Sequence, residues 1–467
     1  MSTDCERIAN AAVPSAASCA TPVSECSVTT VNPLPAPVCG IARVPGDKSI
    51  SHRAVLFSAM AEGTSNVSGV LDSADVRSSL SAVAALGARV YVREQPDGSL
   101  AGTIEGWGAY GPSQPAGAID CGNSGTTVRL LMGMLAPWSV DVELTGDASL
   151  SRRPMKRITG PLSVMGARFQ PEDRETLPLV VAGSGRQRPL VGISYDSPVA
   201  SAQLKTALLL AGVFAEGETE VREPAPSRNH TELMLPEFGV QVRAGDCYAA
   251  VRGGQRMHAA DVAVPGDPSS AAFPVCAAAL VPGSDLTIEQ VSVAPARIGF
   301  VHVLERMGAN ITAENLAPAG REPIGSITIR YTRGLHGCDV QPDEIASMVD
   351  EIPVLALVAA HANGVTRFKG ASELRVKETD RFAAIVEGLA KLGVRAWCEG
   401  SCDLCIEGRS GMKVPTGLEF DSLGDHRLAM TWALVGLTGN ESVRIRDFEA
   451  VCVSYPQFLS DMERLAR

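Results

Sequence analysis

Aromatic residues are scarce in this sequence, at 4% of its 467 residues, and so few of them do not favour an aromatic-lined binding groove. Long apolar runs are missing as well. The longest, such as residues 207–211, are far shorter than the roughly 20 residues that a helix needs to cross a bilayer. An excess of basic residues is also missing, because the net charge is −11, whereas nucleic-acid-binding proteins are more often basic. We therefore expect no membrane span and no nucleic-acid partner, although an acidic protein can still hold a basic pocket.

A disulfide framework is missing too, because the 12 cysteines are irregularly spaced and a chain of this length does not need one. The densest group is Cys398, Cys402 and Cys405, and no histidine lies near it in the sequence. A zinc site needs three or four ligands at tight spacing. We therefore expect reduced thiols and no metal site.

Residues 1–40 lack the continuous apolar core of a secretory signal, and they are poor in the arginine of an organellar transit peptide. Alanine, serine, proline, valine and cysteine dominate this segment, with scattered charge. We expect a disordered extension over residues 1–40 and a cytoplasmic protein.

Two internal repeats are present. A Pro-Gly-Asp turn occurs at residues 45–47 and again at residues 265–267. Five helix-like stretches end in a glycine that is followed by strand-like residues, because glycine adopts the left-handed conformation of a helix C-cap at low cost. These glycines are Gly87, Gly166, Gly239, Gly308 and Gly393.

The glycine spacing is too long for a solenoid, and a sixth helix is expected at residues 458–465. Three units then precede Pro265 and three follow it. We predict an α/β protein with two similar domains, one over residues 47–264 and one over residues 41–46 plus 265–467. A ligand site is expected between them.

Basic residues gather at the starts of helix-like stretches in both halves. Exposed backbone N–H groups, hydroxyls and guanidinium groups suit phosphate or carboxylate. One such cluster alone is more often a solvated surface. Together the clusters predict a cleft for more than one anionic group; they lie at residues 48–53, 121–129, 151–157, 375–381 and 425–427.

Two carboxylate positions accompany these clusters. Glu378 lies between Lys377 and Arg381 in the sequence, so nearby cations favour its ionised form, while burial would raise its pKa. Asp350, next to Glu351, precedes an apolar helix. Carboxylates in such surroundings can transfer protons. These residues indicate a two-domain enzyme that closes on small, phosphorylated anions.

Residues 106–111 fit the G-x-G-x-x-G pattern of dinucleotide-binding loops. That pattern requires a helix to begin at the glycines. Pro112 and Pro115 follow here and interrupt a helix. We predict a surface loop at these residues.

The motifs resemble those of the 5-enolpyruvylshikimate-3-phosphate synthases from about residue 40 onward. They occur in the family's order: PGDKSISHR at 45–53, CGNSGTTVR at 121–129, SRRPM at 151–155, SAQLK at 201–205, LRVKETDR at 374–381 and DHR at 425–427. The resemblance implies two similar domains, each of three βαβαββ units, which form an inverse α/β barrel with the active site in the interdomain cleft.

The resemblance also implies a transferase of the shikimate pathway to chorismate and the aromatic amino acids. The enzyme joins phosphoenolpyruvate to the 5-hydroxyl of shikimate 3-phosphate and releases phosphate through a tetrahedral intermediate. It implies no metal and no organic cofactor. We expect a monomer that acts on these two small molecules.

Roles for single residues follow from the same resemblance. Asp350 would accept the proton of the 5-hydroxyl, and Glu378 and Lys48 would transfer protons at the methylene carbon. The residues implied to bind shikimate 3-phosphate are Lys48, Ser49, Arg53, Ser201, Ala202, Gln203, Ser227, Arg228, Asp350 and Lys377. Those implied to bind phosphoenolpyruvate are Lys48, Gly125, Arg153, Gln203, Arg381 and Arg427.

Some positions depart from the commonest family pattern. Ala202 and residues 350–353 are similar to the class II branch, some of whose members tolerate glyphosate, and residues 452–456 lack a lysine that many members carry. Tolerant members can carry alanine where this chain has Gly125, so we expect no strong tolerance. Two alternatives stay open: the related transferase acting on UDP-N-acetylglucosamine, and a non-catalytic anion-binding protein on the same scaffold.

Overall fold

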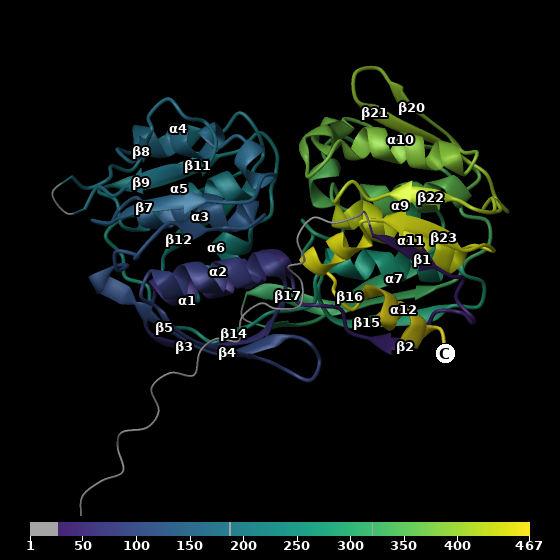
Figure 1. Cartoon of the computed structure of the whole chain (residues 1–467), viewed down its shortest axis with the longest axis horizontal. Coiled ribbons are helices and arrows are strands. Elements are labelled where there is room, and N and C mark those ends of the chain that lie inside the picture. The colour runs from purple at the N-terminus through teal and green to yellow at the C-terminus, as the bar shows by residue number, and fades with distance from the viewer. Residues whose placement is uncertain (1–26, 186–187, 320) are drawn as a thin grey trace, which may run out of the picture.

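The computed structural model describes residues 27–185, 188–319 and 321–467. The chain forms two lobes, each with its own apolar core (Figure 1). The core of the first lobe draws its residues from Ile50 to Val264. The core of the second lobe combines Val31 to Val44 with Ala271 to Leu465.

Helices and strands alternate along both lobes. The first lobe contains α1 (Lys48–Met60), β3 (Glu62–Val70), α2 (Ala74–Ala85), β4 (Arg89–Glu94), β5 (Leu100–Trp107), β6 (Ile119–Asp120), α3 (Gly125–Leu135), β7 (Asp141–Thr145), α4 (Lys156–Val164), β8 (Arg168–Gln170), β9 (Leu179–Ala182), β10 (Ser194–Asp196), α5 (Ala202–Val213), β11 (Glu218–Arg222), α6 (His230–Met234), β12 (Val242–Gly245), β13 (Tyr248–Arg252) and β14 (Val262–Ala263). The second lobe contains β1 (Val28–Val31), β2 (Cys39–Ala42), α7 (Pro268–Leu280), β15 (Asp285–Ser292), α8 (Gly299–Arg306), β16 (Asn310–Ala319), β17 (Glu322–Arg330), β18 (Asp339–Val340), α9 (Ile352–His361), β19 (Gly364–Phe368), α10 (Arg381–Lys391), β20 (Arg395–Glu399), β21 (Asp403–Gly408), β22 (Glu419–Asp421), α11 (His426–Thr438), β23 (Val443–Arg446) and α12 (Phe458–Leu465).

The sheets repeat one pattern. Five of them have four strands, in the orders β14-β3-β5-β4, β6-β7-β9-β8, β10-β11-β13-β12, β16-β17-β15-β2 and β18-β19-β21-β20. Each contains one parallel pair at one edge and two antiparallel pairs, as in β6 with β7, β7 with β9 and β9 with β8. The sixth sheet has the order β1-β23-β22. The element order β6-α3-β7-α4-β8-β9 is a βαβαββ unit, which confirms the repeating unit that the family resemblance implies.

The five predicted helix–glycine–strand joints are confirmed. Gly87, Gly166, Gly239, Gly308 and Gly393 all have φ between +71° and +104°, in the left-handed region. Each lies between the helix and the strand that the sequence placed around it. The prediction of a surface loop at residues 106–111 is confirmed only in part, because β5 runs through to the buried Trp107 and a short 3-10 turn, Gly108–Tyr110, follows it.

The two Pro-Gly-Asp turns are the places where the chain passes between the lobes. Strand β2 of the second lobe leads through the first turn into α1, and β14 of the first lobe leads through the second turn into α7. The turns pair with each other: Asp47 N–H donates to Pro265 O at 2.7 Å, and Asp267 N–H donates to Pro45 O at 2.8 Å. A Cβ on Gly46 would lie 2.0 Å from the Gly69 carbonyl oxygen, so only glycine fits there.

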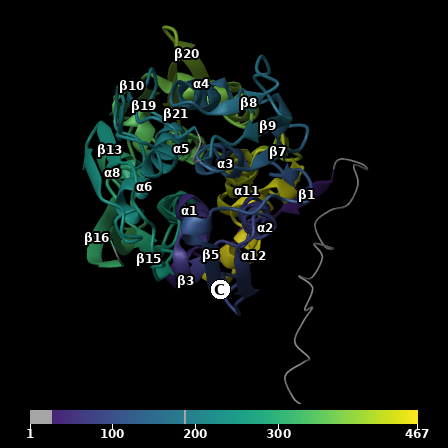
Figure 2. The ribbon, with the colours of Figure 1, turned by 90° about the vertical axis from the view of Figure 1, so that its left-hand side faces the viewer.

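Three helices form the inside of each lobe. In the first lobe α3 contacts both α1 and α5, and in the second α7, α9 and α11 contact one another. Figure 2 shows α1, α3 and α5 toward the middle of the first lobe, with strands around them. Within the described parts of the chain, no helix has both the length and the apolar character that a membrane span requires.

The prediction of a disordered extension over residues 1–40 is wrong for its last part. Strand β1 pairs antiparallel with β23 along four residues, and β2 pairs parallel with β15. Valine and threonine in β1 favour a strand, and the edge of β23 supplies the hydrogen-bond partners that a short peptide lacks. Residues 1–26, the rest of that prediction, lie outside the described residues.

Candidate active site

Inner helices of the first lobe begin at the predicted site residues. Asp47, Ser124 and Ser201 cap α1, α3 and α5, and the side chain of each accepts a backbone N–H of the first turn. The first residues of these helices are Lys48, Gly125 and Ala202, so the positive ends of three helix dipoles accompany the predicted binding motifs.

The second lobe uses its helices in the same way. Asp350 lies just before α9, Arg381 is the first residue of α10, and Arg427 is the second residue of α11. Asp380 and Asp425 cap α10 and α11 through their side chains. Residues that the sequence predicts to bind anions therefore lie at helix starts in both lobes.

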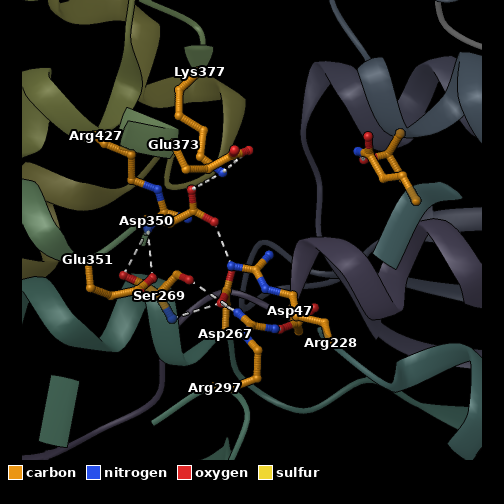
Figure 3. Close-up of polar contacts among 12 residues, drawn as sticks. Asp47, Arg228, Asp267, Ser269, Arg297, Asp350, Glu351, Glu373, Lys377 and Arg427 are labelled. Carbon is orange, nitrogen blue, oxygen red and sulfur yellow. Dashed lines mark hydrogen bonds and ion pairs between the residues drawn. The ribbon is translucent and has the colours of Figure 1, made fainter. Parts of the chain in front are cut away.

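Asp350 connects the two lobes (Figure 3). Its Oδ2 accepts a hydrogen bond from Arg228 Nη2 of the first lobe at 2.5 Å. Its Oδ1 accepts from Arg381 Nη1 at 3.0 Å and lies 3.7 Å from Lys377 Nζ. Burial raises the pKa of Asp350, but Lys377, Arg228, Arg381 and Arg427 outweigh this effect and hold the pKa well below its usual value. Asp350 is therefore a carboxylate at neutral pH.

Arg381 forms ion pairs with several carboxylates of the second lobe. Its side chain is 1% exposed, and its Nε donates to Asp425 Oδ2 at 2.7 Å. Its Nη2 donates to Glu378 Oε2 at 2.7 Å. Loss of water raises the pKa of Glu378, but the charges of Arg381 and Lys377 lower it, and the net pKa lies below its usual value.

Arg427 is buried and incompletely paired. Its Nη1 donates to the Ser269 carbonyl at 3.1 Å and lies 3.8 Å from Glu351 Oε1 (Figure 3). Its buried Nε has no acceptor among the residues that the structure describes. Burial raises the pKa of Glu351, more than the charge of Arg427 lowers it. An unpaired guanidinium N–H at a helix start is suited to an anionic ligand.

A second cluster of polar groups lies in the first lobe. Gln203 Oε1 accepts from Arg129 Nη1 at 2.5 Å, and Gln203 Nε2 donates to Thr126 Oγ1 at 3.0 Å. Gly125 leaves open the space beside two guanidinium groups, because a Cβ there would lie 3.3 Å from Arg153 Nη1 and 3.6 Å from Arg129 Nη1.

Lys48 forms an ion pair with Asp75 of α2. Lys48 also acts on the second lobe: the pKa of His426 lies well below its usual value, first because of burial and then because of the charges of Arg427 and Lys48. The charge of Lys48 therefore lies near enough to the start of α11 to lower the pKa of His426.

Arg53 points into the first lobe. Its guanidinium is buried and donates to Thr231 Oγ1 at 2.8 Å, to Thr206 Oγ1 at 2.7 Å and to the Ser49 carbonyl at 3.0 Å. Burial lowers the pKa of Arg53 to about 10. Ser227 donates its hydroxyl proton to Glu223 at 2.7 Å.

The structure thus brings the predicted residues together in two groups. One group links Arg228, Asp350, Lys377, Glu378 and Arg381 by direct contacts, and the other contains Gly125, Arg153 and Gln203. Across residues 27–185, 188–319 and 321–467, no hydrogen bond or ion pair joins the two groups.

Sequence reasoning assigned no role to Asp75, Arg129 or Arg297. Arg129 has a local signal, because it lies four residues after Gly125 and so on the same face of α3. Arg297 donates to Asp47 and to Asp267 (Figure 3). Two buried aspartates at adjoining turns imply a cation between them, but no pattern in the sequence indicates which one.

Comparison with known proteins supports the family resemblance found in the sequence motifs. The family model described as EPSP synthase (3-phosphoshikimate 1-carboxyvinyltransferase) matches residues 34–462. A 3-phosphoshikimate 1-carboxyvinyltransferase of Xanthomonas euvesicatoria pv. vesicatoria is 45% identical over 421 residues, which are 90% of this chain and 92% of that protein. One of Xanthomonas campestris pv. campestris is 45% identical over 419 residues, 90% of this chain and 93% of that protein.

Solved structures agree. EPSP synthase from Acinetobacter baumannii has a TM-score of 0.83 at 40% identity, over 94% of this chain and 98% of that one. The enolpyruvyl transferase NikO from Streptomyces tendae, at 16% identity, has a TM-score of 0.72 over 94% of this chain and 98% of that one, and it shares the fold. The predicted fold class and the predicted resemblance are confirmed. The chain belongs to the EPSP synthase family.

Proposed function

We propose that this chain transfers the carboxyvinyl group of phosphoenolpyruvate to the 5-hydroxyl of shikimate 3-phosphate and releases phosphate. The contact of Asp350 with Arg228, Lys377 and Arg381 carries the proposal, because it surrounds a carboxylate with cations from both lobes. Two anionic substrates repel each other in water, and a preorganised cationic site offsets that repulsion. The names of the relatives support the same reaction.

In the addition step, Asp350 accepts the proton of the 5-hydroxyl while that oxygen attacks C2 of phosphoenolpyruvate. The Lys48 ammonium gives a proton to the methylene carbon, so that C2 becomes a tetrahedral centre bearing phosphate. The low pKa of Asp350 keeps it ionised in the empty protein. Its basicity rises once the substrate anions share the surrounding cations.

In the elimination step, Glu378 removes a proton from the new methyl group and the bond between C2 and the phosphate oxygen breaks. The proton held by Asp350 leaves with the phosphate, and the proton on Glu378 returns to Lys48. Asp350, Glu378 and Lys48 then have the protonation states that they had before the reaction. The reaction transfers protons, forms the C–O bond between the 5-oxygen and C2, and breaks the C–O bond between C2 and the phosphate. Every acid and base named is a side chain of this chain.

The shikimate 3-phosphate site that we propose centres on Arg228 and Lys377, with Asp350 at the reacting hydroxyl. Arg228 and Lys377 supply the charge for phosphate and carboxylate. Arg53 uses three donors within the protein, and each of its Nη atoms keeps a second N–H for the ligand. The remaining proposed contacts are Lys48, Ser49, Ser201, Ala202, Gln203 and Ser227.

For phosphoenolpyruvate we propose Gly125, Arg153 and Gln203 of the first lobe and Arg381 and Arg427 of the second, with Lys48 between them. The unpaired Nε of Arg427 and the open space at Gly125 support this assignment. Because no contact links the two groups among the described residues, phosphoenolpyruvate would have to bridge them. Closure of the lobes on the substrates is therefore part of the proposal, and a smaller radius of gyration by X-ray scattering with both ligands would support it.

Phosphate release tests the function. We expect turnover with shikimate 3-phosphate plus phosphoenolpyruvate and none with UDP-N-acetylglucosamine plus phosphoenolpyruvate. The reverse result would favour the related nucleotide-sugar transferase. No turnover with either pair, together with retained anion binding, would favour a non-catalytic binding protein.

We also propose two domains, over residues 47–264 and over residues 41–46 plus 265–467, with residues 28–40 added to the second. The pairing of β2 with β15 and of β1 with β23 supports this division. A monomer is proposed because one chain supplies every site residue. The free thiols of Cys39, Cys121 and Cys276 support a cytoplasmic, reducing location.

A further inference from the structure

A buried carboxylate lies beneath two of the segments proposed to bind shikimate 3-phosphate. Glu223 follows β11 and its side chain is 1% exposed. Its Oε1 accepts the Ser201 backbone N–H at 2.6 Å, and its Oε2 accepts the Ser227 hydroxyl proton at 2.7 Å. Ser201 caps α5, whereas Ser227 lies in the loop before α6. One carboxylate therefore sets the separation of two segments that are distant in sequence.

Lys205 supplies the counter-charge for this carboxylate. Its Nζ lies 2.8 Å from Glu223 Oε2 and 2.7 Å from Glu232 Oε1, and its side chain is 4% exposed. A buried carboxylate without a partner is strongly destabilising. With Lys205 between them, Glu223 and Glu232 can both stay inside the lobe, so α5 and α6 are linked through one ammonium group.

A parallel set of contacts ties α1 to the same two helices. Arg53 of α1 donates to Thr206, the neighbour of Lys205 on α5, and to Thr231, the neighbour of Glu232 on α6. The two threonine hydroxyls also bond each other at 2.6 Å. These contacts lie in the buried part of the first lobe, so they fix the starts of α1, α5 and α6 relative to one another.

We propose that Glu223 is a positioning residue for shikimate 3-phosphate, with Lys205 and Glu232 as its charge partners. The proposal rests on the function proposed above, which places Ser201 and Ser227 at that substrate. Glu223 acts through these two residues and does not reach the reacting atoms. Because Ser227 gives its only proton to Glu223, its hydroxyl offers lone pairs to a ligand, and the phosphate must be bound chiefly by Arg228 and backbone N–H groups.

Glutamine cannot replace this carboxylate. Three donors converge on its two oxygens: the Ser201 N–H, the Ser227 hydroxyl and the Lys205 ammonium. An amide has one acceptor oxygen, so its NH₂ group must face one of these donors. In Glu223→Gln the pair Lys205–Glu232 still balances its own charge, so we expect the variant to fold.

Steady-state kinetics of Glu223→Gln tests the proposal. We expect the KM for shikimate 3-phosphate to rise roughly 10- to 100-fold, as for the loss of one or two well-placed hydrogen bonds, with the KM for phosphoenolpyruvate and the saturated kcat within about 3-fold of wild type. Glu223→Asp keeps both acceptor oxygens and should recover part of the loss. The matched control is Glu218→Gln, at an exposed glutamate on β11, which should behave as wild type.

Each outcome decides between the proposals. If wild type turns over and Glu223→Gln behaves like Glu218→Gln, the positioning role is wrong and the function stands. Equal damage to both KM values and to kcat, with no recovery in Glu223→Asp, means a structural role only and also overturns the proposal. If Glu223→Gln does not fold, the KM split in Glu223→Asp decides instead. Absence of wild-type turnover overturns the function and this proposal together.

Discussion

Arg228 Nη2 donates to Asp350 Oδ2 at 2.5 Å, so the guanidinium proposed to bind the phosphate of one substrate is held by the carboxylate proposed to deprotonate that same substrate. The two residues belong to different lobes. Shikimate 3-phosphate and Asp350 therefore compete for Arg228, and binding must exchange one anion for the other.

This competition predicts the behaviour of Asp350→Asn. We expect kcat to fall by about 10²-fold or more, because the general base is lost. We expect the Kd for shikimate 3-phosphate, measured by calorimetry, to be equal to or lower than that of wild type, because Arg228 is released. The control is Asp343→Asn, at an exposed residue of the same segment. Weaker binding by Asp350→Asn would show that the carboxylate holds the substrate and does not compete with it.

Glu378 is predicted to act at the methylene carbon. Glu378→Gln keeps the shape of the side chain and removes proton transfer, and Arg381 keeps Asp350 and Asp425 as partners. We expect turnover to fall by about 10²-fold or more, while the Kd values of both substrates stay close to wild type. Glu387→Gln, on the exposed face of α10, is the control. Unchanged turnover in Glu378→Gln would remove this residue from the mechanism.

Arg297 is predicted to stabilise the junction of the lobes. It pairs with Asp47 and with Asp267, and all three side chains are buried. Arg297→Met leaves two buried carboxylates without a cation, so we expect a loss of about 3–5 kcal/mol in the free energy of unfolding. Arg306→Met, which breaks a partly exposed pair with Glu344, should cost at most about 1 kcal/mol. Urea unfolding of both variants measures this contrast, and equal losses would contradict it.

Gly125 is predicted to control access for glyphosate. Between the carboxyl carbon and phosphorus, glyphosate has one atom more than phosphoenolpyruvate, so glyphosate needs more room. In Gly125→Ala the new Cβ would lie 3.3 Å from Arg153 Nη1. A displacement of about 1 Å in a bound molecule can lower a reaction rate by as much as 10²-fold. We therefore expect the ratio of the glyphosate inhibition constant to the phosphoenolpyruvate KM to rise by about 10-fold or more.

The control for this change is Gly160→Ala in α4, where a Cβ meets no atom within 4 Å. Wild type should be inhibited by glyphosate in competition with phosphoenolpyruvate. Weak inhibition of wild type even at a large excess of glyphosate would contradict the prediction that Gly125 confers no strong tolerance.

The features predicted from the sequence are those set by local chemistry. The glycine joints at Gly87 and Gly393 follow from backbone conformation alone, and the polar helix starts follow from capping. The partners of buried charges do not follow in this way. Arg297 meets Asp47 across 250 residues of sequence, and Glu223 meets Ser201 through the packing of β11 beside α5. Strand β1 was missed because its pairing edge on β23 lies at the other end of the chain.

His52 provides the last prediction, which concerns pH. It is buried on α1 beside Ser79, with Nδ1 at 2.8 Å from Ser79 Oγ, and burial lowers its pKa to about 3. Between pH 6.5 and 3 the unfolded chain therefore binds a proton at this residue and the folded protein does not, so its contribution to stability falls as the pH falls. His52→Gln keeps a hydrogen bond to Ser79 and does not titrate. We expect the unfolding free energy of the variant, relative to wild type, to rise by about 2 kcal/mol from pH 7 to pH 5. The control is His302→Gln, at an exposed histidine. A difference between wild type and His52→Gln that is the same at both pH values would mean that His52 takes up its proton in the folded protein as readily as in the unfolded chain.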